Sequence, residues 1–303
     1  MPTFEEHRSL LTGVAYRILG SVADAEDVVQ EAWLRWSAVD ESIVAEPKAY
    51  LVRVTSRLAI DRLRWAKSRR ESYVGPWLPE PISTEPDVAE HAELADSVEM
   101  ALLVVLETLS PLERAVFVLR EAFDLPFSEI AEIIGRAEPA TRQLARRARE
   151  HVREKRPRFE VDGDERRRIT ERFVNACARG DLDGLIKLLS SEVTLVSDGG
   201  GKARAALRTI TGAENAGRYL LSINTPQNLG RFLVSIGMAE GAGLSFGMGA
   251  VNNAPAVIFS AEGRVVTVVS LLISDGRIDT IYLVANPEKI AHLSPPSDRT
   301  VAG

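Results

Sequence analysis

Apolar residues near the amino terminus recur every three or four positions, which is the spacing of helices that bury one face. The first such pattern is expected to end at Gly20. Ser21 suits the start of a second helix, which continues to about Trp36, and Pro47 suits the first turn of a third. The pattern therefore predicts an all-α domain over residues 1–72.

The middle of the chain changes character and then returns to helical spacing. Residues 73–95 combine prolines with acidic residues, which is typical of an extended linker. Ser110 and Glu113 then form a capping box with a proline between them. Gly135 separates a short apolar helix from a longer one that begins near Glu138. This second all-α domain is expected over residues 96–160.

Helix and strand patterns mix in the last part of the chain. Val193 and Leu195 alternate with polar neighbours, as in a strand. Four strand-like runs follow, near residues 244–251, 255–260, 264–274 and 277–285. Glu262-Gly263 and Asp275-Gly276 between them are hairpin signals. Helices followed by an antiparallel sheet predict an α+β domain over 165–292, with a flexible tail over 293–303.

Composition narrows the class of protein. The 303 residues are 45% hydrophobic and 26% charged, a balance typical of a soluble multi-domain protein. The apolar stretches fall short of the ~20 residues that a membrane-spanning helix needs. The first residues resemble no signal peptide, and the single Cys177 excludes an internal disulfide. We expect a cytoplasmic protein without membrane contact.

The charge is distributed unevenly. The formal net charge is −6, which is unusual for a protein that binds DNA unaided, because phosphate neutralisation supplies most of such affinity. Basic residues nevertheless concentrate over 53–70 and over 136–158. Two basic segments in an acidic chain indicate DNA contact made within a larger assembly.

The second basic segment has the layout of a helix-turn-helix. Thr141, Ala145 and Ala148 share one face of its longer helix. The opposite face carries the residues that would meet base edges and phosphates in the major groove, namely Arg142, Gln143, Arg146 and Arg149. A helical hairpin with a solvated basic face is the alternative for this segment taken alone.

Two more helices carry candidate contact residues. An acidic stripe on the second helix consists of Asp24, Asp27, Gln30 and Glu31, which suit either a basic partner or plain solvation. The third helix combines aromatic and basic side chains, Tyr50, Arg53, Arg57, Arg62, Arg64 and Trp65. Such a combination suits single-stranded DNA, whose bases stack on rings while its phosphates meet cations; a charged helix with two part-buried rings is equally compatible. Asp61 is expected on the apolar stripe of this helix, where it would need a partner.

These strings together resemble a known family. Asp24–Glu31 with Trp33, then Ala49–Arg53 and Leu58–Arg64, are similar to region 2 of extracytoplasmic-function sigma factors, and Leu109–Arg149 resembles their region 4. The resemblance covers about half of the chain. It implies that the acidic stripe docks on core RNA polymerase, that the third helix melts and reads the promoter −10 element, and that Arg142, Gln143 and Arg146 read the −35 element. Arg57 and Tyr50 stand where many members have Asn and Trp, so the resemblance does not define the preferred −10 sequence.

Three further strings resemble the sigma-J-like subgroup, whose carboxy-terminal extension is SnoaL-like, with a nuclear-transport-factor-like cone fold. They are Trp77–Pro81, Asp198–Lys202 and Asn286–Ile290. The subgroup's extension is thought to tune activity, which implies an intramolecular contact with the linker and sigma domains. The residues expected to make it are Trp77, Pro79, Asp198, Gly199, Gly200, Lys202, Asn286 and Pro287. The glycine run lacks the spacing of a phosphate-binding loop, and a sharp loop or close backbone contact is the better interpretation.

The sequence thus predicts an alternative sigma factor without catalytic residues, metal or cofactor. Two other functions remain open. SnoaL-like domains include polyketide cyclases, and Asp198 or Glu192 could serve as an acid–base group, although no paired constellation stands out. A stand-alone helix-turn-helix repressor with a ligand-sensing domain is the other alternative, and it leaves the region-2-like half unexplained.

Overall fold

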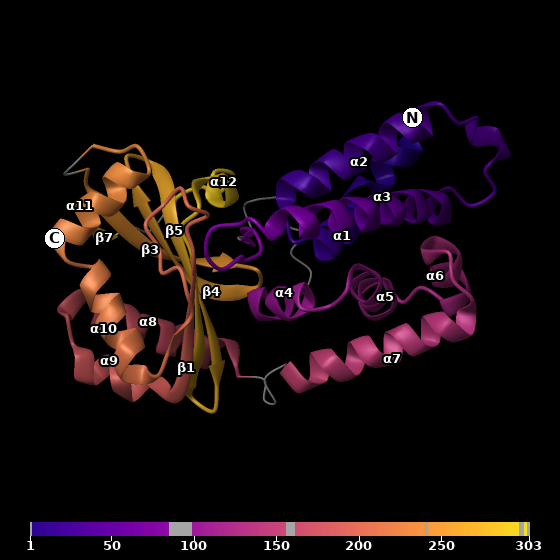
Figure 1. The fold of residues 1–303 in the computed structure, drawn as a ribbon. Coiled ribbons are helices and arrows are strands. Elements are labelled where there is room, and N and C mark those ends of the chain that lie inside the picture. The colour runs from indigo at the N-terminus through magenta and orange to yellow at the C-terminus, as the bar shows by residue number, and fades with distance from the viewer. Residues whose placement is uncertain (1, 85–98, 156–160, 240–241, 297–299, 302–303) are drawn as a thin grey trace. The chain divides into compact units, whose positions relative to one another are not determined.

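The structure, a computed structural model, describes residues 2–84, 99–155, 161–239, 242–296 and 300–301. Its chain forms two compact units (Figure 1). The first joins Met1–Glu71 with Ala89–Arg156, and the second joins Ser72–Val88 with Pro157–Gly303. The described part of the expected linker, up to residue 84, therefore belongs to the same unit as the carboxy-terminal domain, and residues 85–95 lie outside the described ranges.

The amino-terminal helices follow the sequence pattern closely. They are α1 (Pro2–Leu19), α2 (Val22–Ser37), the 3₁₀ turn η1 (Glu41–Ile43) and α3 (Pro47–Arg70). Gly20 ends α1 with a φ of 69°, a left-handed conformation that costs a glycine little. The Ser21 hydroxyl then accepts a hydrogen bond of 3.2 Å from the backbone N–H of Asp24. This cap fixes the start of α2.

The second group of helices contains the expected helix-turn-helix. The helices are α4 (Met100–Glu107), α5 (Pro111–Glu121), α6 (Phe127–Ile134) and α7 (Glu138–Lys155). Both halves of the Ser110–Glu113 capping box are formed at the start of α5. Gly135 caps α6 at φ 66°, and α7 begins three residues later. Helix α5 packs on α1 and α3, while α6 packs on α3, which makes one unit of both helical groups.

The second unit contains a seven-stranded sheet in the order β2-β1-β6-β5-β4-β3-β7. The strands are β1 (Leu189–Asp198), β2 (Ile210–Thr211), β3 (Leu244–Val251), β4 (Ala254–Ala261), β5 (Arg264–Ser274), β6 (Arg277–Val284) and β7 (Thr300–Val301). All neighbouring strands are antiparallel except β1 and β6, which run parallel. The parallel β1–β6 pair therefore lies between antiparallel pairs on both sides.

Helices cover one face of this sheet and close the core (Figure 1). They are α8 (Gly163–Arg179), α9 (Leu182–Leu188) and α10 (Ala213–Ile223); α11 (Pro226–Ser235) and the short α12 (Pro287–Ile290) follow. Phe173 and Leu185 from the helices pack with Val193, Leu195 and Ile281 from the sheet. The expected α+β cone-like fold is confirmed.

The hairpin turns explain the strand register. Glu262-Gly263 has φ values of 50° and 77°, and Asp275-Gly276 has 49° and 72°. Asn252-Asn253 has 50° and 58° and joins β3 to β4 in the same way. Positive φ at both central residues matches the right-handed twist of antiparallel strands, so each dipeptide fixes a tight hairpin.

Candidate functional site

The acidic stripe of α2 is exposed but already has a basic neighbour. Asp27, Gln30 and Glu31 are exposed, whereas the Asp24 side chain is 23% exposed. Arg62 on α3 contacts Asp24 and Asp27 at 2.7 Å and 2.9 Å. The hydrogen bond to Asp24 raises the pKa of Arg62, which stays charged. One residue expected to meet DNA therefore stabilises the acidic stripe, a pairing that crosses 38 residues of sequence.

The aromatic residues on α3 differ in their surroundings. Tyr50 lies against the buried Trp36, with ring centroids 5.6 Å apart. Trp65 is 51% exposed, and the Arg62 guanidinium lies 5.2 Å from its ring centroid. Trp65 is thus the more exposed of the two rings.

The expectation for Asp61 was wrong. The Asp61 side chain is 72% exposed and pairs with Arg64 at 2.8 Å. The buried stripe of α3 follows Val52, Ala59 and Leu63, so Asp61 points to solvent. The loop before α3 exposes Ile43 to 76%.

Arg53 and Arg57 contact the helix-turn-helix. The Arg57 guanidinium donates to the carbonyl oxygens of Glu132 and Ile133, at 2.7 Å and 3.3 Å. Arg53 pairs with the Glu132 carboxylate at 3.2 Å. Because these carbonyls belong to the last turn of α6, Arg57 meets the negative end of a helix dipole. In this conformation, two side chains of α3 that were expected to reach −10 DNA contact α6.

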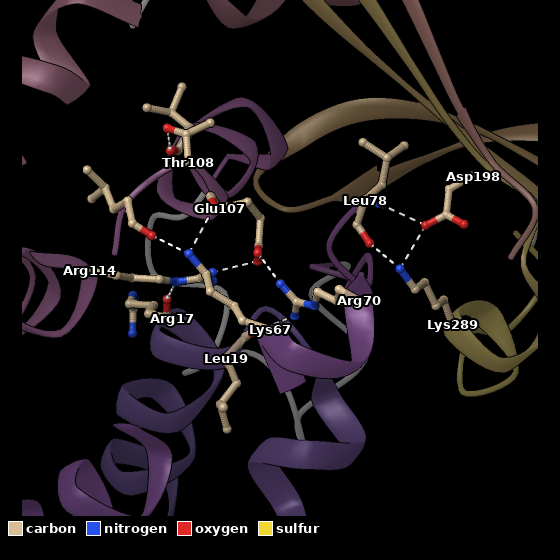
Figure 2. Close-up of polar contacts among 12 residues, drawn as sticks. Arg17, Leu19, Lys67, Arg70, Leu78, Glu107, Thr108, Arg114, Asp198 and Lys289 are labelled. Carbon is tan, nitrogen blue, oxygen red and sulfur yellow. Dashed lines mark hydrogen bonds and ion pairs between the residues drawn. The ribbon is translucent and has the colours of Figure 1, made fainter. Parts of the chain in front are cut away.

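A buried ionic cluster holds the two helical groups together (Figure 2). The Glu107 carboxylate at the end of α4 accepts hydrogen bonds from Arg70 on α3 and from Arg114 on α5, the latter at 2.5 Å. Arg114 is fully buried and also donates to the carbonyl oxygen of Arg17 at 3.1 Å. The Lys67 ammonium lies 3.4 Å from the Glu107 carbonyl oxygen and also donates to that of Leu109. One carboxylate thus compensates several cations.

The recognition helix α7 has the face division that the sequence predicts. Thr141, Ala145 and Ala148 are buried. The opposite, exposed residues are Arg142, Gln143, Arg146 and Arg149. Each of these arginines has an acidic neighbour: Glu138 at 2.5 Å from Arg142, Glu150 at 2.9 Å from Arg146, and Glu121 at 2.7 Å from Arg149.

The linker meets the carboxy-terminal domain at a buried carboxylate (Figure 2). Asp198 ends β1 and is 0% exposed. Its Oδ1 accepts the Tyr73 hydroxyl at 2.6 Å, and its Oδ2 accepts the Leu78 backbone N–H at 2.8 Å and the Lys289 ammonium at 2.7 Å. Burial and the hydrogen bond to Asp198 raise the pKa of Tyr73, so the hydroxyl remains a donor.

Two aromatic rings of the linker enclose the Lys289 ammonium. It lies 3.0 Å from the Trp77 ring centroid and 5.1 Å from that of Tyr73. The two rings meet edge to face, with centroids 4.9 Å apart. Lys289 also donates to the Leu78 carbonyl oxygen at 2.5 Å. A buried ammonium is thus held by an anion, a carbonyl and two π faces.

The glycine loop approaches the linker closely. Gly200 has a φ of 58°, and a Cβ there would lie 2.3 Å from the Asn286 amide nitrogen and 2.8 Å from the Tyr73 hydroxyl oxygen. A Cβ on Gly199 would lie 2.3 Å from the Ala203 carbonyl oxygen, inside the loop itself. Lys202 pairs with Glu288 on α12, whose N-cap is Asn286 and whose first residue is Pro287.

The rest of the described linker follows the edge of the sheet. The N–H of Asn252 donates to the Ile82 carbonyl oxygen at 3.0 Å, and the N–H of Thr84 donates to that of Ala250 at 2.9 Å. Pro79 is buried within this segment, and a His292 ring nitrogen lies 2.8 Å from the Pro81 carbonyl oxygen. Tyr73, Lys289, Asn252 and His292 were missing from the residues expected at this junction.

Within the described ranges, no helix is long and apolar enough to cross a membrane. Among the same residues, no group of three or more His, Cys, Asp or Glu side chains could hold a metal ion.

Comparisons with known proteins match both halves of the first unit and the chain as a whole. The models for Sigma-70 region 2 and Sigma-70, region 4 match residues 3–69 and 99–152. The ECF RNA polymerase sigma factor SigJ of Mycobacterium tuberculosis is 38% identical over 98% of this chain and 94% of its own length. A probable ECF sigma factor SigI of that organism is 38% identical over 71% of this chain and 73% of its own. The crystal structure of SigJ matches with a TM-score of 0.74 and 36% identity, covering 94% of this chain and 96% of that one.

Proposed function

Because the chain belongs to the extracytoplasmic-function family of RNA polymerase sigma factors, and is thus an alternative sigma factor that directs transcription initiation, we propose that its carboxy-terminal domain tunes promoter use by holding the linker between its two sigma regions. The observation that carries this proposal is the buried Asp198, which bonds Tyr73, Leu78 and Lys289 together. A linker that only spanned solvent would not require a buried carboxylate to bind it.

Holding the linker limits how far the two sigma regions can separate. Between Glu71 and Glu99 a fully free chain spans at most about 95 Å, whereas the 15 residues beyond Thr84 span at most about 50 Å. Docking therefore restricts the distance between the −10-reading and −35-reading surfaces. Release of the linker widens that range, which makes the junction a two-state element.

The proposed function also assigns roles to exposed residues of the two sigma regions. Asp24, Asp27, Gln30 and Glu31 dock on a basic helix pair of core polymerase, and Arg142, Gln143, Arg146 and Arg149 face −35 DNA. Tyr50, Arg53, Arg57, Arg62, Arg64 and Trp65 serve the −10 element. Arg53 and Arg57 must first leave Glu132, so DNA binding by α3 requires α6 to move. The sigma family is non-catalytic in general, and we infer that this chain acts in the cytoplasm without catalysis of its own.

The core-binding assignment predicts a charge-specific effect. Replacing Asp27 by Lys should weaken binding to core polymerase at least tenfold, because close interfacial charge pairs contribute about 1.5–7 kcal/mol. Glu6→Lys is the matched control, since Glu6 is also an exposed glutamate but lies on α1 and outside the acidic stripe. Titration of labelled sigma with core measures both. Equal affinities for the two variants would remove the assignment.

The linker proposal predicts a change in the promoter spacing that the holoenzyme accepts. Gly200→Ala should release the linker and broaden the accepted −10/−35 spacing, because its Cβ would collide with Asn286 and Tyr73. Gly237→Ala is the control: Gly237 has a similar φ of 77° but no atom within 4 Å of a Cβ. Transcription with core enzyme on templates of graded spacing measures the effect. A chain ending after residue 160 should behave like Gly200→Ala; identical spacing profiles for all chains would contradict a tuning role.

A further inference from the structure

One arginine of α7, Arg142, contacts both an aromatic ring and a carboxylate. The Arg142 guanidinium lies 4.6 Å from the ring centroid of Phe127, the first residue of α6. Its Nε and Nη2 both donate to Oε1 of Glu138, at 3.1 Å and 2.5 Å. Arg142 is thus fixed by a ring from the first helix of the motif and by a carboxylate one turn earlier in its own helix.

The Phe127 ring is itself contacted from the turn between α5 and α6. The Arg120 guanidinium lies 5.2 Å from the Phe127 centroid. Arg120 donates to the Leu125 carbonyl oxygen at 3.0 Å and pairs with Asp124 at 3.0 Å. The contacts form a column from the turn, through Phe127, to the first turn of the recognition helix, where a helix-turn-helix protein meets base edges.

We propose that Phe127 and Glu138 are positioning residues that present Arg142 end-on to a guanine of the upstream promoter element. Guanine accepts two parallel hydrogen bonds at O6 and N7, and an arginine can offer them from its two terminal nitrogens. Glu138 occupies the Nε side of the guanidinium, so Nη1 and the second hydrogen of Nη2 remain for the base. The proposal rests on the proposed function, because it assumes that α7 reads the −35 element.

Arg146 provides the contrast within the same helix. It also pairs with a glutamate four residues away, Glu150, at 2.9 Å, but the glutamate follows it in sequence. The Arg146 side chain is 78% exposed, and no aromatic contact is recorded for it among the described residues. An arginine held by one exposed ion pair keeps its rotamer freedom and suits a phosphate, which needs charge more than direction.

The test uses the holoenzyme, reconstituted from the full chain and core polymerase, on duplex promoters randomised over the upstream element. Sequencing the templates that yield transcripts gives a preference at each base pair. Arg142→Ala should abolish the preference for guanine at one position, where a bidentate contact is worth roughly five- to 150-fold. Phe127→Leu should lower that preference about two- to fivefold at the same position, which is the magnitude of an exposed cation–π contact. Glu138→Gln should lower it about twofold, and the double variant should combine both losses.

Controls separate positioning from simple loss of structure. Phe127→Tyr keeps the ring and should keep the guanine preference, and Glu150→Gln should alter overall yield but not the preference at that position. Loss of α6 packing would lower yield on all templates without changing the preference at one base pair.

The outcomes distinguish this inference from the proposed function. If Arg142→Ala removes the guanine preference while Phe127→Leu and Glu138→Gln leave it intact, the positioning role is overturned and −35 reading by α7 stands. If the unaltered holoenzyme shows no upstream preference, both fail.

Discussion

Replacing Glu107 by Gln should destabilise the first unit by about 3–5 kcal/mol, the usual cost of breaking a buried ion pair by removing one partner. The change removes the carboxylate that Arg70 and Arg114 share, with Lys67 bonded to carbonyls beside it. The guanidinium of Arg114 has no access to solvent and cannot lose its proton, so its charge would remain uncompensated.

Hydrogen exchange, followed peptide by peptide, measures this effect in the full chain. Amides of α4 and α5 should exchange faster in Glu107→Gln, while those of β5 and β6 should not change. Glu113→Gln is the matched control, since Glu113 lies near the same cluster but serves as a partly exposed helix cap, where a loss costs about 1 kcal/mol. Equal protection in both variants would show that the cluster does not hold the helices together.

The same cluster makes the first unit sensitive to acid. Burial acts to raise the pKa of Glu107, but the charges of Arg114 and Arg70 outweigh it and leave the pKa below its ordinary value. A carboxyl with a lowered folded-state pKa contributes stability that is complete above its unfolded pKa of about 4.3 and is lost as the pH falls through the folded value. The unaltered chain should lose this contribution below about pH 4, and Glu107→Gln has none to lose.

Replacing Asp198 by Ala should detach the linker from the carboxy-terminal domain. The substitution leaves Lys289 buried without its anion and removes the acceptor of both Tyr73 and the Leu78 N–H. Breaking one partner of a buried ion pair costs about 3–5 kcal/mol. The linker should then become a substrate for limited proteolysis between residues 73 and 84.

Two further variants test whether loss of the buried Asp198–Lys289 ion pair causes the cleavage. Lys202→Ala breaks only the exposed Lys202–Glu288 pair and should cost at most about 1 kcal/mol, with little new cleavage. Asp198→Asn combined with Lys289→Met removes both charges and should restore part of the protection that Asp198→Ala loses. Cleavage that is the same in Asp198→Ala and in the unaltered chain would contradict the assigned role of this carboxylate.

The sequence predicts local features well because their signals are local. Gly135 and the Ser110–Glu113 box define the helix-turn-helix within a few residues, and Asp275-Gly276 defines a hairpin by its backbone preferences. The sequence also suggests that the glycine run approaches another segment, since glycine permits such contact. These features depend on residues that are neighbours along the chain.

Contacts between residues far apart in the sequence were missed because no local signal marks them. Lys289 meets Leu78 across 211 residues, and no periodicity marks a lysine on a four-residue helix as buried. Arg62 and Asp24 each look like solvated surface charges, although the packing of α2 on α3 joins them. The acidic, proline-rich composition of the linker gives no sign that Ile82 and Thr84 continue the hydrogen bonding of a sheet edge.

The separation between Leu78 and Lys289 also sets an order of events during synthesis. At about 5–20 residues per second, the ribosome needs roughly 10–40 s to add the 211 residues that separate the two partners. Throughout that interval the helices of region 2, and then those of region 4, can fold while the linker lacks the lysine that completes its binding site. If the carboxy-terminal domain restrains the sigma half as proposed, each newly made chain passes through a period in which that half can fold but is not yet restrained, and the position of Lys289 in the chain sets the duration of that period.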